Sequence, residues 1–423
     1  MNAKSKFKLH TYKTRLIVAL IAVLLISSLT AVYVSIVNSN DPSTDDTIHV
    51  KNEKELTNAI NKAKNPTTVK LDHDITLTKP IVISNKKEIT LTSTTTENFF
   101  KLIGATDQTT INVDSGVLHL AGITVTHVSE TNGLGVNVTE GGKLFMISGE
   151  ISGNNGWGDR YGYGSGVAVY KDGFFEMTGG VIANNRGSRF GGGVWVGGFF
   201  NMSGNAVIAN NYNYTDCTGC GVYNEGSFVM SGNSVIANNT AEFGGGVFNQ
   251  GSFVMTGNSL ITNNYALSGG GVYNEFQGSF VMTGNSLIAN NTASMGDVSK
   301  DDESKGYVSK GGGVSNWGSF EMSDNAVISG NVADHGGGVC IDSGGSFVLS
   351  GNGMIVNNTV GRGGGVHVGE AWSSEEGVFE MLGGKISGNF AELDYGGVYN
   401  AGTFNQSGGI ISGNKTNGKH PNQ

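Results

Sequence analysis

Proline is almost missing from this chain. Its 423 residues include only Pro42, Pro66, Pro80 and Pro421, and none lies in the repetitive region that ends near residue 415. A strand inside a sheet uses its backbone N–H groups as hydrogen-bond donors, and proline has no such group. A long stretch without proline therefore favours closely paired strands. The chain also has no collagen-like period.

Cysteine and charge are scarce as well. Three cysteines are too few for the disulfide framework of a small secreted domain. The formal net charge is −9, and no concentrated basic patch follows the first fifteen residues. Nucleic acid is therefore not expected as a partner. No nonapeptide calcium-binding repeat occurs, so neither a metal nor another cofactor is predicted.

What the chain has in abundance is glycine, placed in a repeating phrase. Its 68 glycines are roughly twice the ordinary usage. A glycine-rich step into valine recurs, and an asparagine pair follows it; residues 221–239, GVYNEGSFVMSGNSVIANN, show the fullest form. The valines of this step are Val167, Val194, Val222, Val247, Val272, Val314, Val339, Val366 and Val398. The basic unit of about 25 residues cannot bury its own apolar side chains, so successive units must stack into a solenoid.

The first 37 residues have the pattern of a targeting segment. Residues 1–15 contain five basic residues and no acid, and residues 16–37 are uncharged and mostly aliphatic. Twenty-two residues in a helix span about 33 Å, enough to cross a bilayer. The basic flank predicts a cytoplasmic N-terminus. An uncleaved transmembrane signal anchor and a signal peptide cut near Ser28 and Thr30 both remain open. Under either interpretation we expect the remainder at the cell surface or outside the cell.

The exported part divides into a linker at 38–47, a cap helix and first coils at 48–128, repetitive coils at 129–415 with a polar insertion at 293–310, and a polar tail at 416–423. Within residues 52–64, one helical face carries Leu56, Ala59, Ile60 and Ala63. We expect this amphipathic helix to cover the open strand edges at the start of the solenoid.

Alternation along each coil predicts which side chains point inward. In residues 221–239, Val222 and Asn224 share one parity, and Phe228 and Met230 share another. The phenylalanines expected in one internal stack are Phe145, Phe175, Phe200, Phe228, Phe253, Phe280, Phe320, Phe347, Phe379 and Phe404. The methionines expected beside them are Met177, Met202, Met230, Met255, Met282, Met322 and Met381. We interpret this methionine column as packing rather than cofactor ligation.

Asparagine ends the third strand of each coil. The repeated residues are Asn185, Asn211, Asn239, Asn264, Asn291, Asn331, Asn358, Asn389 and Asn414. Stacked amides can donate a hydrogen bond to one neighbour and accept one from the other. We therefore expect a structural ladder that satisfies the buried polar groups of this corner.

With the repeats defined, the chain resembles a known group. Residues 48–83 are similar to the strand, cap helix and first coils of the pectate-lyase-like superfamily. The GGGV and IANN elements stand where adhesin-like or polymorphic-outer-membrane-type surface proteins carry a Gly-Gly-Ala-Ile-like step and a Phe-x-x-Asn element. The resemblance covers residues 48–415. It implies an all-β fold, a right-handed single-stranded parallel β-helix, with a short cap helix after the transmembrane helix. It says less about activity, because the superfamily includes enzymes and scaffolds.

An enzyme of this superfamily would need residues that the repeats do not show. Its polysaccharide lyases resemble one another in calcium-binding aspartates and an Arg-x-Pro-x-x-Arg element, which an array without proline cannot contain. Its glycoside hydrolases use an Asp-Asp step and a Gly-His-Gly. Here Asp301 and Asp302 form the only such step in the array, inside the polar insertion, and Gly-His-Gly is missing. Glycoside cleavage needs two acids held on rigid elements, so no catalytic residue is predicted.

The residue after each repeated valine is expected to face outward. Four adjacent coils would thereby present Trp195, Tyr223, Phe248 and Tyr273 as an exposed column. Exposed aromatic surface often marks a binding site, and flat rings suit the faces of sugars. The alternative is that these rings stabilise the sheet or lie under a loop. Corner loops that could rim the same groove carry Asp159, Arg160, Arg189, Glu242, Asp334, His335, Arg362 and Asp394.

Cys217 and Cys220 form a lone C-x-x-C pair. A structural zinc site would need two more ligands nearby, and no second pair exists. A redox motif would want the start of a helix, which this corner does not offer. A disulfide between the two cysteines and two free thiols both remain open.

Three functions from different classes fit these observations. The leading hypothesis is a non-enzymatic, adhesin-like cell-surface protein that binds a surface glycan or protein through the outer face of the solenoid. Residues 16–37 would hold it to the membrane. The alternative is a carbohydrate-active enzyme, either a polysaccharide lyase or a glycoside hydrolase. The third is a passive spacer with no ligand.

Overall fold

The computed structural model describes residues 47–129, 131–156, 163–187, 189–212, 217–294, 309–369 and 375–422. The predicted cytoplasmic tail, the transmembrane segment at 16–37 and nearly all of the linker lie outside these residues. Most of the insertion at 293–310 also lies outside them, including Asp301 and Asp302. Within the described ranges, no helix has both the length and the apolar character needed to span a bilayer.

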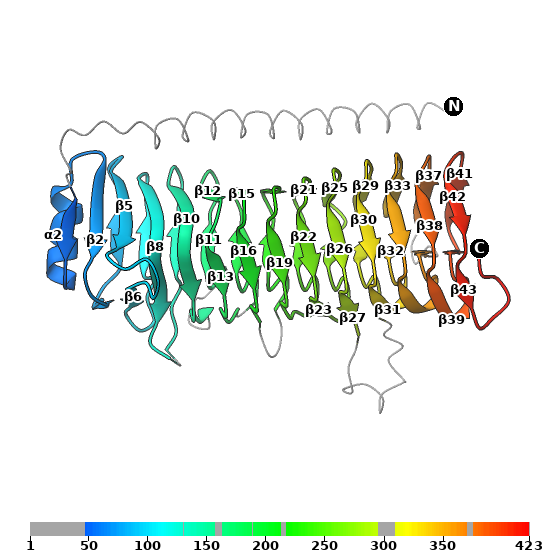
Figure 1. The fold of residues 1–423 in the computed structure, drawn as a ribbon, viewed down its shortest axis with the longest axis horizontal. Coiled ribbons are helices and arrows are strands. Elements are labelled where there is room, and N and C mark those ends of the chain that lie inside the picture. Colours follow the sequence, from blue (N-terminus) through cyan, green and yellow to red (C-terminus); the bar gives the residue numbers. More distant parts are fainter. Residues whose placement is uncertain are drawn as a thin grey trace. The chain divides into compact units, whose positions relative to one another are not determined.

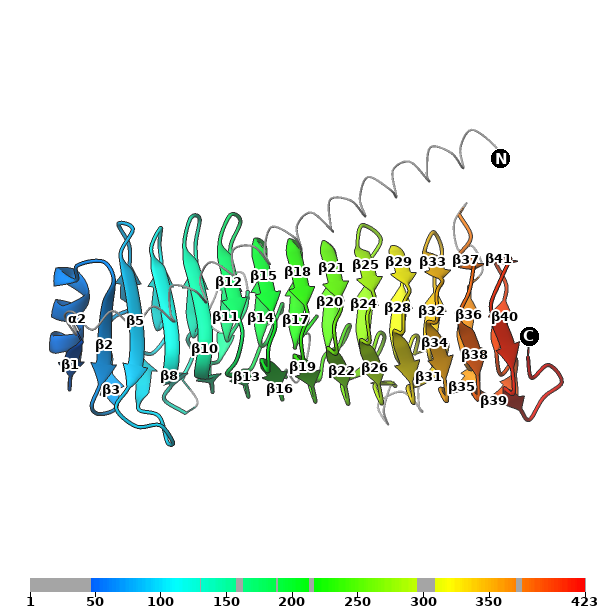
Figure 2. The ribbon, with the colours of Figure 1, turned by 45° about the horizontal axis from the view of Figure 1, so that its top comes forward.

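The described residues between 47 and 422 fold into an all-β parallel solenoid, whose coils follow one another from the α2 end to the β41–β43 end (Figure 1). Each coil contributes one short strand to a sheet that we call the Val sheet, with twelve strands among the described residues. These are β4 (Ile81–Ile83), β7 (Ile111–Val113), β9 (Val136–Val138), β11 (Val167–Val169), β14 (Val194–Val196), β17 (Val222–Asn224), β20 (Val247–Asn249), β24 (Val272–Asn274), β28 (Val314–Asn316), β32 (Val339–Ile341), β36 (Val366–Val368) and β40 (Val398–Asn400). Figure 2 shows β14, β17, β20, β24, β28 and β32 side by side.

Each coil then turns into a second strand, and these form the Phe strands. They are β1 (Ile48–Val50), β2 (Thr67–Leu71), β5 (Glu88–Ser93), β8 (Val117–His127), β10 (Lys143–Ser152), β12 (Phe174–Met177), β15 (Phe199–Met202), β18 (Ser227–Met230), β21 (Ser252–Met255), β25 (Ser279–Met282), β29 (Ser319–Met322), β33 (Ser346–Leu349), β37 (Val378–Met381) and β41 (Thr403–Gln406).

A third set, the Ile strands, closes the coil. They are β3 (Ile75–Thr76), β6 (Lys101–Gly104), β13 (Val181–Ala183), β16 (Val207–Ala209), β19 (Val235–Ala237), β22 (Leu260–Thr262), β26 (Leu287–Ala289), β30 (Val327–Ser329), β34 (Met354–Val356), β38 (Lys385–Ser387) and β42 (Ile410–Ser412). Because β8 and β10 run through the corner without a break, the Phe and Ile strands join into one sheet. Later coils add a small corner sheet of β23 (Tyr265–Ala266), β27 (Thr292–Ala293), β31 (Val332–His335), β35 (Thr359–Arg362), β39 (Phe390–Asp394) and β43 (Lys415–Thr416).

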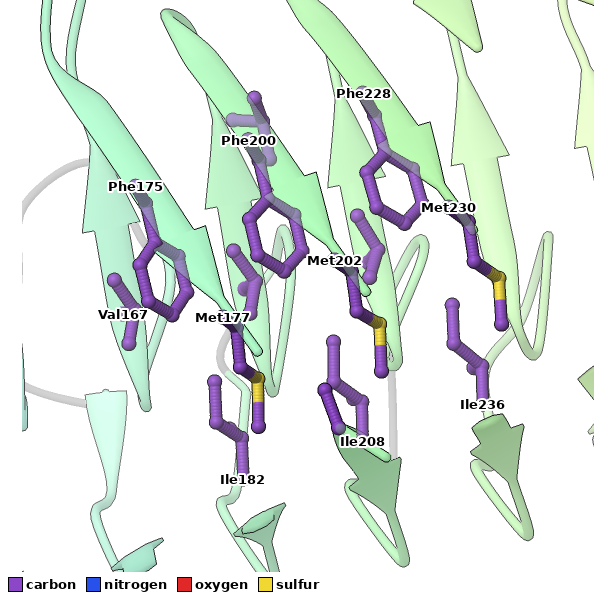
Figure 3. Packing of buried hydrophobic residues seen from close by; sticks show 14 of the residues in the cluster. Val167, Phe175, Met177, Ile182, Phe200, Met202, Ile208, Phe228, Met230 and Ile236 are labelled. Atoms are coloured by element: carbon purple, nitrogen blue, oxygen red, sulfur yellow. The ribbon is translucent and has the colours of Figure 1, made fainter. Parts of the chain in front are cut away.

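Parallel pairing in register places like residues over like residues along the solenoid. Phe228 pairs with Phe253 and Met230 with Met255, and the two phenylalanine rings stack at 4.8 Å and 4°. Figure 3 shows the same arrangement for the phenylalanine, methionine, isoleucine and valine side chains of three coils. The fully buried phenylalanines are Phe175, Phe200, Phe228, Phe253, Phe280, Phe320, Phe347 and Phe379, and Phe404 packs partly buried at the end of the row. The predicted internal stack is confirmed for these residues.

Phe145 is the exception, and its expected place in the stack is wrong. Leu144 pairs with Phe175, whereas Phe145 pairs with Glu176 and stacks on His119 at 5.0 Å on the outer side of the sheet. A shift of one residue moves a side chain to the other face of a strand. The spacing in the sequence would have revealed the register. Met146 pairs with Met177, and the inward residue two positions before the methionine is Leu144 in this coil and Phe175 in the next.

This register predicts unequal effects of two neighbouring alanine substitutions. Leu144→Ala removes a fully buried side chain, and we expect it to lower the free energy of unfolding by about 2–5 kcal/mol. Phe145→Ala removes a half-buried outer ring, and a loss of about 1 kcal/mol or less is expected. Urea unfolding followed by circular dichroism measures both. A larger loss for Phe145→Ala would show that the register is different.

The predicted cap helix is present as α2 (Glu53–Lys62). Asn52 caps its first turn by accepting a hydrogen bond from the Glu55 N–H at 3.0 Å. Leu56 and Ile60 are buried in the hydrophobic core of the first coils. The helix lies at the β1–β2 end of the solenoid (Figure 2). It covers the end of the core there, which would otherwise be exposed to solvent.

The repeated asparagines form a continuous hydrogen-bonded ladder. Asn239 donates from its backbone N and its Nδ2 to Asn264 Oδ1, at 2.9 and 3.0 Å, and Asn264 repeats both bonds to Asn291 Oδ1. Each Nδ2 also donates to an isoleucine carbonyl of an Ile strand. The ladder includes Asn154, Asn185, Asn211, Asn239, Asn264, Asn291, Asn331, Asn358, Asn389 and Asn414.

Two further asparagine ladders were not anticipated. A short buried one joins Asn224, Asn249, Asn274 and Asn316 by amide hydrogen bonds of 2.7 Å. An exposed one joins Asn205, Asn233, Asn258, Asn285, Asn325 and Asn352. Both ladders have a signal in the repeat. The buried ladder uses the asparagine two residues after the repeated valine, and the exposed ladder uses the asparagine in the turn after the methionine.

Candidate functional site

The outward side chains of the Val sheet form a single row along the solenoid. The flanking residues of each strand point into the core, so the middle residue points outward. In register, this outer row contains Val82, Asn112, Asn137, Ala168, Trp195, Tyr223, Phe248, Tyr273, Ser315, Cys340, His367 and Tyr399. The four predicted ligand-binding aromatic residues are therefore neighbours, as expected.

Their rings stack, but three of them are not exposed. Tyr223 and Phe248 stack at 5.0 Å, and Phe248 and Tyr273 at 5.1 Å, with interplanar angles of 7° and 4°. Trp195 is only 6% exposed, Tyr223 4% and Phe248 7%, while Tyr273 is half-buried. The expectation of an exposed aromatic column is wrong for the first three residues.

A second aromatic row, at the corner before the Val sheet, packs against Trp195, Tyr223 and Tyr273, while Phe248 lies between the stacked rings of Tyr223 and Tyr273. Tyr163 lies 4.4 Å from Trp195, Phe190 lies 4.8 Å from Tyr223, and Phe243 lies 5.4 Å from Tyr273, all between ring centroids. Each corner ring covers the outward ring of the following coil. These corner residues stand four positions before the repeated valine, a spacing that would have revealed them.

Burial also sets the electrostatics of the two tyrosines in the row. Burial, followed by the nearby Glu225 and Glu275, raises the pKa of Tyr223 above its usual value. Burial is likewise the first cause that raises the pKa of Tyr273. The Tyr223 hydroxyl donates to Gln250 Oε1 at 3.0 Å. Both phenols therefore stay neutral and serve as packing and hydrogen-bonding groups.

The same row becomes polar in its later coils. Lys310 Nζ lies 2.5 Å from Asp342 Oδ1 and 5.5 Å from the centroid of the Trp317 ring. The Ser315 hydroxyl donates to Asp342 Oδ2 at 3.4 Å. Burial raises the pKa of Asp342 although Lys310 opposes it. Burial is the largest single influence and lowers the pKa of Lys310, but Asp342 and Cys340 together outweigh it, so the net direction is upward. We regard this as a partly buried ion pair, because Asp342 is buried and Lys310 is 25% exposed; sequence reasoning missed both of its members.

Two histidines extend this polar part. His335 occupies the corner position and stacks on the outward His367 at 4.7 Å, and His367 stacks on Tyr399 at 4.6 Å. Burial, and then the positive charge nearby, lowers the pKa of His367 to about 3. The pKa of His335 is lowered mainly by burial as well.

These histidines predict a loss of stability in mild acid. The folded pKa of His367 is depressed, so its contribution is present above the ordinary value near 6.5 and is lost as the pH falls toward 3. Between pH 7 and pH 5 this amounts to about 2 kcal/mol. His367→Tyr keeps a stacking ring without the titration and should remove this part of the pH dependence. Tyr399→Phe is the matched control and should retain it. Urea unfolding at both pH values measures the difference, and equal slopes for the two variants would contradict the assignment.

The cysteines do not supply a reactive thiol at this row. Burial raises the pKa of the Cys340 thiol well above its ordinary value, which disfavours the nucleophilic thiolate. The structure joins Cys217 and Cys220 in a disulfide with a Cα–Cα distance of 5.8 Å. In the described part of the chain, no three His, Cys, Asp or Glu side chains are grouped to hold a metal ion.

The charged corner residues do not form one rim. Arg189 lies over the Phe190 ring, 5.7 Å from its centroid. Asp334 belongs to a coil several turns further along the solenoid, where it accepts a hydrogen bond from the Ser309 hydroxyl at 2.7 Å. Asp159 and Arg160 lie outside the described residues. Of the predicted rim residues, three are paired in successive coils: His335 with Arg362 in the register of β31 and β35, and Arg362 with Asp394 in the register of β35 and β39.

A pocket opens at the early end of the outer row. It has a volume of ≈ 280 Å³ and is lined by Asp107, Gln108, Thr109, Gly133, Leu134, Asn137, Asn155, Gly156 and Tyr170. Asn137 belongs to the row itself, and Tyr170 meets Trp195 edge-on at 5.2 Å. The pocket thus borders the buried aromatic cluster. Sequence reasoning missed it because its walls come from the irregular early coils, where the repeat is absent.

Comparisons with known proteins add no family to this description. No protein-family model matches the chain, and neither curated proteins nor solved structures show a significant match. The chain is therefore described by its own architecture. It is a parallel β-solenoid in which part of the outer row is a packed aromatic cluster, with a polar pocket beside that cluster.

Proposed function

We propose that this protein is a non-enzymatic, adhesin-like binding protein of the cell surface, and that it holds a glycan or protein against the outer face of the Val sheet. In this proposal the solenoid is a right-handed β-helix of the pectate-lyase-like type. Residues 16–37 place it outside the cytoplasm and attach it to the membrane.

The observation that carries the proposal is the pocket beside the aromatic cluster. Trp195 and Tyr223 are packed under corner rings, and Phe248 lies between the stacked rings of Tyr223 and Tyr273, so they support a rigid wall rather than offer their faces to a ligand. A rigid scaffold that presents polar groups at fixed positions reduces the entropy lost on binding. The half-buried Tyr273 and the exposed Asp107 at the pocket are among the accessible parts of this face.

Binding of residues 47–423 to a glycan array and to cells tests the proposal. The core residues that start at Val50 belong to this part of the chain, so the fragment contains the whole solenoid. We expect saturable binding to a defined ligand without its breakdown. Pectin, alginate and neutral polymers, each with and without calcium, test the enzymatic alternative. Reproducible release of unsaturated or reducing ends would replace the binding function by catalysis.

A further inference from the structure

The pocket at the early end of the outer row is built mainly from polar groups. Its walls come from the corner before β7, the corner before β9, the turn after β10 and the end of β11. Asp107 is exposed and accepts a hydrogen bond from Asn132 Nδ2 at 3.0 Å through Oδ1. Four separate coils therefore fix the positions of the lining groups.

Two lining residues of the pocket have a hydrogen-bond acceptor without a donor. Asn137 donates to Thr109 Oγ1 at 3.1 Å, and Asn155 donates to Asn132 Oδ1 at 3.2 Å. The amide oxygens of Asn137 and Asn155 are buried and have no hydrogen-bond partner among the described residues. An unpaired buried acceptor is unfavourable, so a ligand that brings hydroxyl donors would satisfy what the protein leaves open.

The charge of the lining selects among such ligands. Asp107 brings a carboxylate, and none of the described lining residues is Lys, Arg or His. Among the described lining residues, a ligand carboxylate would meet Asp107 with no cation to compensate the repulsion, which disfavours uronates and other anions. A neutral polyol has no such repulsion, and its hydroxyls can donate to the carboxylate.

The size of the pocket and its aromatic wall limit the ligand to a small sugar. A pocket of ≈ 280 Å³ is at the small end of ligand sites, so it suits one sugar ring rather than a long chain segment. Tyr170 supplies an aromatic wall next to Trp195. We propose that this pocket binds one neutral pyranose residue of a glycan through Asp107, Asn137 and Asn155, after a small rotation of the two amides, and that it discriminates against uronates. This inference rests on the proposed binding function.

Titration calorimetry and saturation-transfer NMR with residues 47–423 test the inference. The neutral probes are maltose, cellobiose and N,N′-diacetylchitobiose, and the anionic probe is digalacturonate. We expect at least one neutral disaccharide to bind with a Kd of about 0.1–5 mM, and digalacturonate to bind at least about ten-fold more weakly. Asp107→Asn should weaken the neutral sugar about five-fold or more, because a charged acceptor is lost. It should also reduce the discrimination against digalacturonate.

A matched control exists for the charge. Asp107 and Asp324 both have left-handed backbones, with φ of 56° and 54°, a conformation that asparagine tolerates. Asp324 lies in a turn several coils away, so Asp324→Asn should leave sugar binding unchanged. Asn155→Ala is a second pocket variant, and unchanged circular dichroism of each variant verifies folding.

The outcomes separate the pocket from the general function. If the fragment binds a glycan and Asp107→Asn and Asn155→Ala leave that binding unchanged, the pocket assignment is overturned while the binding function stands. If digalacturonate binds as tightly as the neutral sugars, the assigned ligand class is overturned. If no saccharide, protein or cell surface binds, both proposals fail.

Discussion

Asn264→Ala is expected to lower the free energy of unfolding by about 3–6 kcal/mol. The Asn264 side chain accepts from the backbone N and the Nδ2 of Asn239, and it donates to the Ile236 carbonyl. Removing it takes one hydrogen bond from each of these three buried groups, and each loss costs about 1–3 kcal/mol; the smaller loss is expected at Asn239 Nδ2, which keeps its bond to the Ile208 carbonyl. The estimate is large because Asn264 is only 1% exposed, so water cannot replace the lost partners.

The exposed ladder provides a control in the same coil. Asn258 donates to Asn233 Oδ1 and accepts from Asn285 Nδ2, both at 3.2 Å, but these residues are exposed. Water can take over both bonds, so Asn258→Ala should cost less than about 1 kcal/mol. Thermal and urea unfolding of the two variants measure the contrast. Similar losses at the two positions would remove the buried ladder as a principal source of stability.

The second large effect is expected for Phe253→Ala, with a loss of about 3–5 kcal/mol. The Phe253 ring is fully buried between Phe228 and Phe280, each at 4.8 Å and within 5° of parallel. The stacked rings hold the coils at a fixed spacing, so a smaller side chain leaves a cavity that neighbouring coils cannot fill without losing their own register. Phe253→Leu should cost less, because it leaves less empty volume.

Hydrogen exchange can localise this effect along the solenoid. Stability in a repeat array depends on the contacts between neighbouring coils, so protection should fall most in β18, β21 and β25. Phe276→Ala is the control, because Phe276 is 65% exposed, and it should change stability by no more than about 0.5 kcal/mol. A uniform loss of protection over all coils would contradict the nearest-neighbour account.

Positions that repeat at the interval of one coil could be assigned from the sequence. Phe253 and Asn264 recur with the same neighbours in successive units, and parallel pairing in register must place them over their counterparts. Phe145 shows where this reasoning fails: it lies before the regular repeats, and a one-residue difference in register moved it to the outer side.

The candidate site was predictable in part. The repeat correctly aligned Trp195, Tyr223, Phe248 and Tyr273 in one row. It did not reveal that corner rings cover Trp195 and Tyr223, because inward and outward parity describes a strand and says nothing about the segments that fold over it.

The sequence by itself therefore determined the parallel stacking, the buried phenylalanine row and the asparagine ladder. The physical reason is that a 25-residue unit can bury its apolar side chains and pair its polar groups only on copies of itself. Only the tertiary structure decided which outward residues stay accessible. Tyr163 covers Trp195, Lys310 reaches Asp342, and Asn155 joins Asn137 in one pocket. Tyr163 and Lys310 both stand four positions before the repeated valine, but the alternation of a strand does not say whether a corner side chain folds over the neighbouring coil. The pocket residues come from early coils that depart from the repeat.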